Sequence, residues 1–567
     1  MTGEIVSYSD KPWIKSYKLG PYKLQENLEI PTIPLNKLLD EAASDYPDKN
    51  AIFFQDWVIT YKDLRLTVDK LAAGLADLGV KKGDRVAIVL PMSPQIVICC
   101  FAIWKAGGVV LLATPLARPD EIEYELSEAG AETIICLDEA DPRIASLDSI
   151  LSMRDKTKIR HIIVTSRKDF SLEEETEIRE IPGTTNVRRL IAESAPEPPA
   201  IEIDPAEDMA TLMFTGGTTG VPKGVMLTHS SNMAVVLSGF PWVVKPLQAG
   251  IWGKASILII MPMYHAAGFW AMLQSIYMGL RTMLVPDPRD TDNILKVIKE
   301  NRPMMIVATP TQLMRLVQRK VGKLPSLVIS TGAPLPLEIA QAWKKETGVP
   351  VAQAYGASEG GVLLNISGFS KLTGFIPVEK TGIGVPAPNV EVKIVDPETN
   401  EEVPVGEVGE ICVSGPHVMK GYWPTVGSGL KEGWLHTGDL GTMDEDGYFC
   451  LEDRIKDMIN VSGLKVYSVK VEEVLFKHPA VAVAAAIGIP DPERPGSERV
   501  KAFIKLKEGY EGEVTAKDII TLCQEQLPPY AVPRSVEFRE DLPISAVEKL
   551  FKRALREEEI AKMKAGK

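Results

Sequence analysis

Short apolar runs alternate with stretches of helical spacing through most of the chain. One unit joins a strand at 85–90 to a helix at 94–105 and a second strand at 108–112. A strand–helix–strand order favours a parallel sheet with helices on both faces. Further apolar runs lie at 133–137, 159–165, 256–261, 304–308 and 327–331. The pattern therefore predicts a large α/β domain built from parallel sheets.

The pattern changes towards the C-terminus. Between about 385 and 450, short alternating strands are separated by Pro and Gly turns, which predicts a small β-rich subdomain. After Asp453 a helix at 468–477 is followed by strands at 481–487 and 500–506. We therefore expect a large domain over 1–455 and a small α+β domain over 456–567.

The most apolar stretch, 86–115, is interrupted by two prolines, a lysine and two glycines. These interruptions favour buried strands and a helix over a membrane span, because a span needs about 20 consecutive apolar residues. The first thirteen residues contain charges and no apolar core. We therefore expect no cleaved signal peptide.

Composition limits the function classes. The net charge of −13 over 567 residues argues against a large nucleic-acid interface, which needs clustered Lys and Arg. The six cysteines form no C-x-x-C pair, which favours a reduced, cytoplasmic protein. A homodimer and a peripheral membrane contact remain open.

A glycine- and threonine-rich segment at 215–224 follows the apolar strand 210–214. Glycines let backbone N–H groups turn towards an anion, and hydroxyls and a lysine add donors. A Walker-type phosphate loop requires Gly before its Lys, but Pro222 stands there. The candidate anion-binding residues are Thr215, Gly216, Gly217, Thr218, Thr219, Gly220 and Lys223.

A second pattern, Gly-Ala-Ser-Glu-Gly at 356–360, fits the nucleophile elbow of serine hydrolases, with Asp439 and His478 downstream. An elbow needs a helix after Ser358, and the glycines that follow disfavour one. The six histidines lack zincin or zinc-finger spacing. The sequence therefore predicts neither a hydrolase nor a protein-ligated transition metal.

Segment 215–224 resembles the signature loop of the adenylate-forming superfamily, which includes acyl-CoA synthetases, luciferase and adenylation domains. Further segments resemble family motifs in the family's order, at 332–334, 355–359, 434–440 and 453–457. The resemblance covers nearly the whole chain. It implies an ATP-dependent acyl-CoA ligase that uses Mg²⁺ and coenzyme A, with a mobile C-terminal domain.

The resemblance also assigns roles in nucleotide binding. Tyr355 would stack on adenine, and Glu359 would bind Mg²⁺. Ser358 replaces the usual Thr and keeps a hydroxyl for the α-phosphate, while Asp439 would accept from the ribose hydroxyls. The remaining implied nucleotide contacts are Gly332, Ala333, Pro334, Gly356 and Arg454.

Segment 262–269 resembles the family's acyl-pocket segment, and places His265 beside the substrate carboxylate or the thiol tunnel. It contains no Asp to hold an amino-acid ammonium, and its small and aromatic residues suit an apolar acid. Segments 12–17 and 46–48 are similar to those of fatty-acid–CoA ligases. We therefore expect a medium- or long-chain fatty acid as the small-molecule substrate.

The terminal segment 542–550 resembles the family's catalytic motif and places Lys549 on its lysine. Val547 and Glu548 stand where the family has Thr and Gly. Lys456 matches the family's hinge position, and 461–465 its mobile loop. The departure keeps open a nucleotide-binding relative that has lost catalysis. An adenylating enzyme with a carrier-protein or oxygen acceptor is a further alternative.

Overall fold

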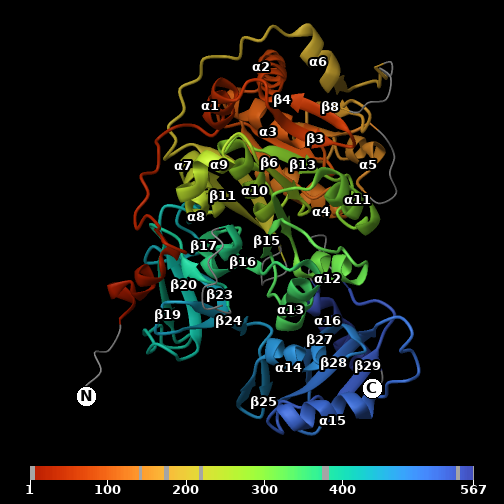
Figure 1. The fold of residues 1–567 in the computed structure, drawn as a ribbon. Helices are drawn as coiled ribbons and strands as arrows, with labels where there is room; N and C mark the ends of the chain where they lie inside the picture. The colour runs from red at the N-terminus through yellow and green to blue at the C-terminus, as the bar shows by residue number, and fades with distance from the viewer. Residues whose placement is uncertain are drawn as a thin grey trace.

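The computed structural model describes residues 7–138, 144–170, 178–215, 221–372, 382–543 and 550–565 of the chain. Two large sheets come first along the sequence, followed by a β-rich sheet and a C-terminal α/β unit, coloured from red to blue in Figure 1. The predicted site residues 216–220 and Lys549 lie outside the described residues.

The first large sheet has eight strands, and its central strands run parallel. Strands β5 to β8 bury nearly every residue, as expected where helices cover both faces of a parallel sheet. In spatial order the strands are β21 (Gly421–Tyr422), β11 (Lys223–Thr228), β10 (Met209–Thr215), β6 (Val109–Leu112), β5 (Arg85–Val89), β7 (Thr133–Leu137), β8 (His161–Thr165) and β9 (Thr185–Asn186).

The second large sheet has nine strands, parallel from β16 to β3 and antiparallel at both edges. Each apolar run that predicted a strand here forms one. In spatial order the strands are β18 (Val385–Pro386), β17 (Gly360–Leu364), β16 (Val351–Ala357), β15 (Leu327–Thr331), β14 (Met305–Ala308), β12 (Ser256–Ile259), β13 (Arg281–Leu284), β3 (Asn50–Phe54) and β4 (Trp57–Thr60).

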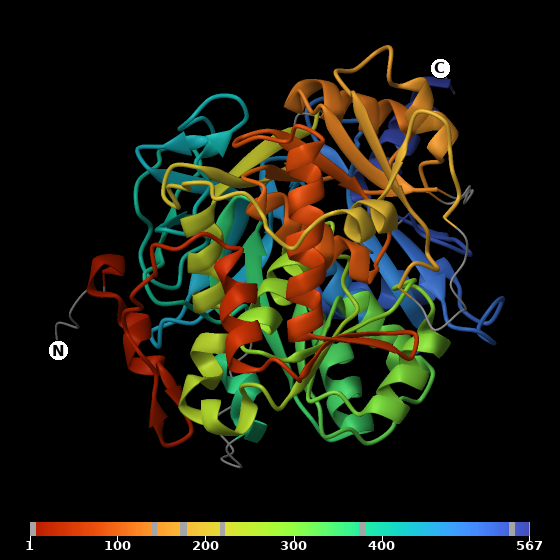
Figure 2. The same cartoon turned by 90° about the horizontal axis from the view of Figure 1, so that it is seen from above.

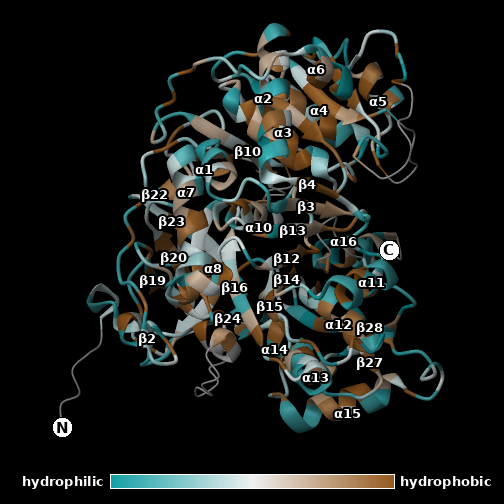
Figure 3. Cartoon of the chain, turned by 45° about the horizontal axis from the view of Figure 1, so that its top comes forward, coloured by the Kyte–Doolittle hydropathy of each residue, from teal (hydrophilic) through white to brown (hydrophobic). Residues whose placement is uncertain are grey.

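Helix α3 (Pro94–Lys105) forms the centre of the core and is buried at every residue. A mostly apolar helix must be covered on all sides, and Figure 3 shows α3 as mainly hydrophobic. Trp104 of α3 packs edge-on against Phe101 and Phe269, and its indole N–H donates to the Ala210 carbonyl at 2.8 Å. Lys105 ends the helix in an ion pair with Asp40 at 2.6 Å.

The other helices flank the sheets, and Figure 2 shows several of them crossing one face of the molecule. They are α1 (Lys37–Asp45), α2 (Tyr61–Asp77), α4 (Pro119–Ala129), α5 (Leu147–Ser152), α6 (Val187–Glu193), α7 (His229–Ser238), α8 (Phe240–Val244), α9 (Gln248–Ile251), α10 (Ala266–Tyr277), α11 (Thr291–Asn301), α12 (Pro310–Gln318), α13 (Leu337–Thr347), α14 (Ser468–Phe476), α15 (Ala516–Gln526) and α16 (Lys552–Ala565). Short 3₁₀ turns are η1 (Tyr8–Asp10), η2 (Pro12–Ser16), η3 (Lys245–Leu247) and η4 (Ile366–Leu372).

The predicted β-rich region forms a five-stranded antiparallel sheet. Its strands are β19 (Glu391–Val395), β20 (Gly409–Ser414), β23 (Trp434–Met443), β22 (Leu430–Lys431) and β24 (Phe449–Arg454). A two-stranded ribbon near the N-terminus pairs β1 (Lys18–Leu19) with β2 (Tyr22–Lys23).

The C-terminal unit packs hydrophobic clusters drawn from residues beyond 458. Its strands are β25 (Ile459–Val461), β26 (Leu464–Val466), β27 (Val481–Pro490), β28 (Glu498–Leu506) and β29 (Ser535–Phe538). Figure 1 places this unit beyond β24, below α12 and α13. The predicted fold class is confirmed, while the boundary at 455 and 456 stays a prediction.

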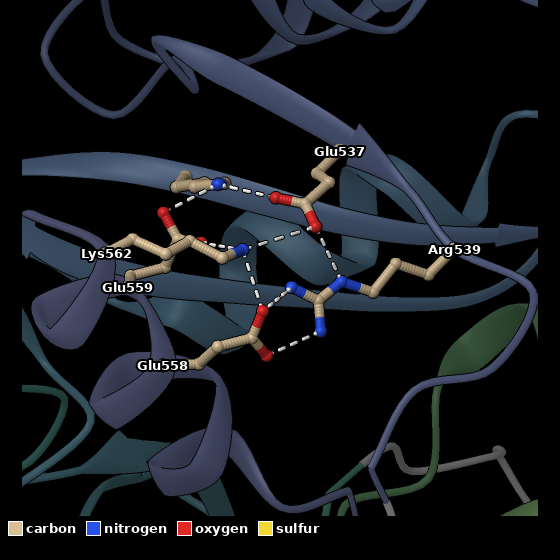
Figure 4. A network of polar contacts seen from close by, with 6 residues as sticks. Glu537, Arg539, Glu558, Glu559 and Lys562 are labelled. Atoms are coloured by element: carbon tan, nitrogen blue, oxygen red, sulfur yellow. Dashed lines mark hydrogen bonds and ion pairs between the residues drawn. The ribbon is translucent and has the colours of Figure 1, made fainter. Parts of the chain in front are cut away.

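An ionic network attaches helix α16 to the C-terminal sheet (Figure 4). Lys501 of β28 contacts Glu537 and Glu559, each at 2.7 Å. Arg539 forms a two-pronged contact with Glu558, with N–O distances of 2.8 and 2.9 Å. The network fixes the helix that follows the predicted catalytic Lys549.

No single helix among the described residues combines the length and the apolar character that a membrane span requires. The pair His229–Ser238 and Phe240–Ile251 meets both requirements together but bends by 42° at its break.

Candidate active site

The predicted site residues gather where strands of both large sheets end. Thr215 closes β10, His265 follows β12, Gly332 follows β15, and Tyr355 lies near the end of β16. Ligand sites in open α/β sheets form at the carboxyl ends of strands. These four residues line one cavity of about 2820 Å³.

A carboxylate at the centre of the cavity joins two of the predicted nucleotide residues. The Tyr355 hydroxyl donates to Asp439 Oδ2 at 2.7 Å, and Arg454 Nε donates to Asp439 Oδ1 at 2.8 Å. Asp439 and Arg454 face each other across β23 and β24 as a direct register pair. The sequence separates Tyr355 from Asp439 by 84 residues, so only the fold brings them together.

The tyrosine and the arginine of this cluster keep the protons that they donate. Burial, followed by the Asp439 charge, raises the pKa of Tyr355 well above its ordinary value, so the phenol remains a donor. Asp439, which is almost fully buried, raises the pKa of Arg454. A carboxylate has about four acceptor positions, so Asp439 can still accept from two ribose hydroxyls.

Glu359 is held by a residue that the sequence analysis missed. The Tyr422 hydroxyl donates to Glu359 Oε1 at 2.9 Å, and Lys223 Nζ lies 5.0 Å from the centre of the Tyr422 ring. Burial and the Glu359 charge raise the pKa of Tyr422 above its ordinary range. No sequence spacing links Tyr422 to Glu359; a backbone hydrogen bond from the Met419 N–H to the Glu359 carbonyl, at 2.7 Å, brings their segments together.

The two described ends of the phosphate-loop motif face each other. Thr215 and Lys223 are direct partners in the antiparallel β10–β11 ladder, and both line the cavity. Lys223 therefore lies beside the Tyr422 that holds Glu359, with Thr215 opposite it in the ladder. The arrangement offers a cation and a carboxylate to a polyphosphate and its counterion.

Backbone geometry explains why two positions in the cavity wall are occupied by glycine. Gly332 has φ +88°, a conformation that favours glycine. A Cβ on Gly356 would lie 2.6 Å from the Gly361 carbonyl oxygen, so a side chain there would force β16 and β17 apart. Ala333, Pro334 and Ser358 line the same wall.

An apolar recess lies between α7, α8 and α10. His265 precedes α10 and packs its ring edge-on to Tyr264, at 4.8 Å between centroids. Trp270 is fixed by a 2.9 Å hydrogen bond from its indole N–H to Asn232. The recess is lined by Val235, Gly239, Phe240, Met261, Ala266, Ala267, Trp270, Ala271 and Gln274. Such a wall suits the apolar body of an organic acid.

The C-terminal unit closes the other side of the cavity. Leu542 and Leu550, on either side of segment 544–549, both line it. The Phe551 N–H donates to the Pro543 carbonyl at 2.8 Å, which ties the two ends of that segment together. The two flanks of segment 544–549, which together form its base, are therefore fixed at the cavity.

A buried polar cluster joins residues that precede and follow Lys456, the predicted hinge, in the sequence. Asp453 accepts from the backbone N–H of Ser468 and from its hydroxyl, the latter at 3.0 Å. Lys552 contacts the Ser468 hydroxyl at 2.8 Å and Glu472 at 2.7 Å. Burial lowers the pKa of Lys552, but Glu472 and Asp453 outweigh it and the net shift is upward.

The hydrolase alternative meets a structural obstacle. Strand β17 begins at Gly360, directly after Glu359, and pairs antiparallel with β16. An elbow needs a helix at that point.

The described site residues that line the cavity are Thr215, Lys223, His265, Gly332, Ala333, Pro334, Tyr355, Gly356, Ser358, Glu359, Asp439, Arg454 and Lys456. Their individual roles stay predictions.

The fold and this cavity define a nucleotide-dependent enzyme with two unequal domains. The family model described as AMP-binding enzyme matches residues 39–423, and that described as AMP-binding enzyme C-terminal domain matches 470–549. The chain belongs to this family, and the predicted resemblance is confirmed.

Three individual relatives are similar to the chain over nearly its full length. The chain is 35% identical over 579 residues to a long-chain-fatty-acid–CoA ligase of Bacillus subtilis, covering 97% of this chain and 98% of that one. An anthranilate CoA ligase solved with anthranoyl-AMP is 26% identical with a TM-score of 0.82, covering 95% and 99%. An o-succinylbenzoate CoA synthetase of Bacillus subtilis, solved with ATP and magnesium, is 27% identical with a TM-score of 0.74, covering 94% and 100%.

Proposed function

We propose that this protein is an ATP-dependent fatty-acid–CoA ligase. It joins a medium- or long-chain fatty acid to coenzyme A through an acyl-AMP intermediate and releases AMP and pyrophosphate. The observation that carries the proposal is the meeting of three parts at one cavity. These are the Tyr355–Asp439–Arg454 cluster, the Glu359–Tyr422–Lys223 cluster and the base of the terminal-motif segment.

The residues suit the first half-reaction. A fatty acid is already ionised at neutral pH, so its carboxylate needs no general base to attack the α-phosphorus. Repulsion between anions is the barrier, and Lys223 and Lys549 are the proposed cations that offset it as pyrophosphate leaves. Tyr355 and Asp439 hold the adenosine.

The donor set around Glu359 fits Mg²⁺. A magnesium ion that bridges phosphates needs only one or two protein carboxylates, and Glu359 supplies one. Tyr422 fixes the direction of that carboxylate. When bound, the ion would offset charge on the polyphosphate.

The observed orientation of the C-terminal unit suits adenylation. Leu542 and Leu550 lie at the cavity, whereas Leu464, in the β25–β26 hairpin, is about half exposed to solvent. The second half-reaction needs a path for the thiol. We propose that the unit turns about Lys456 between the two steps, which breaks the Asp453–Ser468 contact.

The relatives' printed substrates support a fatty acid, and the apolar recess beside His265 supports the same class. No disulfide joins any of the six cysteines, all of which lie among the described residues. This supports a reducing compartment, and we propose the cytoplasm.

A thioester assay tests the proposal. The full-length protein is incubated with ATP, Mg²⁺, coenzyme A and saturated acids of graded length, and AMP and acyl-CoA are measured. We expect equal amounts of both products, with a maximum among medium or long acids. AMP without acyl-CoA would favour a carrier-protein or oxygen acceptor, and the absence of both products would overturn the proposal.

A further inference from the structure

We infer that Glu410, Cys412 and His436 form a site for a single zinc-class cation beside the nucleotide cavity. One ligand atom of each residue lies within 4.8 Å of the other two. The inference does not depend on the ligase function proposed above. It concerns a different cluster, and its primary readout is metal binding.

Strand geometry creates the cluster. Cys412 of β20 and His436 of β23 are direct cross-strand partners, so their side chains project to the same face. Glu410 lies two residues before Cys412, and a register shift between them turns it towards the same point. The ligands come from two strands, which is why no local histidine spacing predicted them.

The donor atoms already converge. Glu410 Oε2 lies 2.8 Å from His436 Nδ1, and Cys412 Sγ lies 3.5 Å from the same nitrogen. One imidazole, one thiol and one carboxylate form a ligand set typical of Zn²⁺, which accepts mixed S, N and O donors. On binding, the thiol would release its proton to water and coordinate as the thiolate.

The surroundings leave room for a fourth ligand. Glu410 and His436 line the cavity, so an open position can be filled by water. Glu410 and Cys412 are buried, which favours a fixed geometry. The nearby cation Lys393 lies over the Trp434 ring at 4.6 Å and 3.8 Å from Glu402, so other groups partly offset its charge.

A metal bound at this site would affect the predicted nucleotide-binding residue Asp439. The other oxygen of Glu410 accepts from the Gly438 N–H at 2.9 Å, and Gly438 precedes Asp439. A metal that draws Glu410 away would loosen this bond and displace Asp439. We therefore expect bound metal to raise the KM for ATP.

Cadmium and zinc binding test the inference. Thiolate-to-Cd²⁺ absorption is titrated on the full-length protein, and Zn²⁺ is titrated by calorimetry, with circular dichroism checking each variant's fold. We expect one ion per chain in the wild type and in Cys450→Ser, a control cysteine that lines the same cavity. Cys412→Ser should lose the absorption. His436→Gln should lose affinity by about 10-fold or more, since even outer-shell partners are worth that much.

A kinetic readout follows. Zn²⁺ should raise the KM for ATP in the wild type and much less in Cys412→Ser. Absence of stoichiometric binding in the wild type would overturn the inference. So would unchanged Cd²⁺ absorption in Cys412→Ser, or equal loss in Cys450→Ser.

Discussion

Glu359 shows how much a single side chain depends on its neighbour. Glu359 lies in the turn between β16 and β17, and the Tyr422 hydroxyl directs its carboxylate. The two residues can therefore be tested as a pair, because Tyr422→Phe removes the hydrogen bond while leaving the carboxylate in place.

We predict that Glu359→Gln lowers adenylation by on the order of 10²-fold at limiting Mg²⁺, because a ligand charge is lost. Tyr422→Phe should lower it much less. Carboxylate-dependent pyrophosphate exchange across a magnesium titration measures both. Near-normal exchange by Glu359→Gln at limiting Mg²⁺ would refute the proposed metal role.

Lys549 directly follows Val547 and Glu548, the two residues that depart from the family motif. We predict that Lys549→Ala costs on the order of 10²-fold or more in adenylation, because a cation beside the developing charge is removed. Coenzyme A attack on supplied acyl-AMP should change little. Pyrophosphate exchange and single-turnover thioester formation separate the two steps.

A matched control is Lys564→Ala, an exposed lysine of helix α16, which follows Lys549 in the sequence. It should leave both steps unchanged. Glu548→Gly should leave adenylation equal or higher if Glu548 hinders Lys549, and lower if Glu548 orients it. Full exchange by Lys549→Ala would mean that another cation serves the first step.

Gly239 lines the apolar recess at a point where the structure leaves no space for a side chain. A Cβ there would lie 1.8 Å from Gln274 Nε2, so Gly239→Ala must push Gln274 aside. We predict a loss in kcat/KM for the longest acids that exceeds the loss for short ones by about 10-fold, the order of one methylene in a pocket. Gly250→Ala, where a Cβ meets no atom within 4 Å, is the control. An equal loss at every length would refute the assignment.

At the scale of elements, α16 is held by charged contacts in addition to the buried Leu555. Hydrogen bonds from Arg539 and Lys562 lower the pKa of Glu558 from 4.5 to about 2. A carboxyl group with a lowered folded-state pKa stabilises at pH values above 4.5 and loses that contribution as the pH falls towards 2. The terminal helix should therefore loosen in acid.

We predict that Glu558→Gln weakens α16 docking at pH 7 by about 1 kcal/mol or less, since the group is exposed. The difference from wild type should shrink as the pH falls from 4.5 towards 2. Hydrogen exchange of α16 measures it. Glu557→Gln serves as control, because Glu557 pairs with Arg553 of the same helix. An equal effect there would contradict the prediction.

At the scale of the whole molecule, the proposed rotation of the C-terminal unit about Lys456 can be tested by separating the two half-reactions. We predict that Lys456→Pro impedes rotation, because proline fixes φ. Pyrophosphate exchange should persist while thioester formation falls. Lys456→Ala, which leaves φ free, should retain both steps. Equal loss of both half-reactions in Lys456→Pro alone would contradict a rotating domain.

The sequence by itself determined the fold class and most of the candidate site. Apolar runs separated by helices specify parallel sheets, because strands buried on both faces need apolar residues throughout. The loop at 215–224, the aromatic–Gly–x–hydroxyl–Glu segment and Asp439 are local patterns, so they could be found without coordinates.

The tertiary structure decided what lies beyond local spacing. Tyr422 reaches Glu359 because the nearby Met419 N–H donates to the Glu359 carbonyl, and Asp439 reaches Tyr355 through the meeting of two sheets. Cys412 and His436 meet only because β20 and β23 pair in one register. Sequence separation carries no information about such contacts, because hydrogen-bonded pairing between distant strands, not chain proximity, sets which side chains share a face.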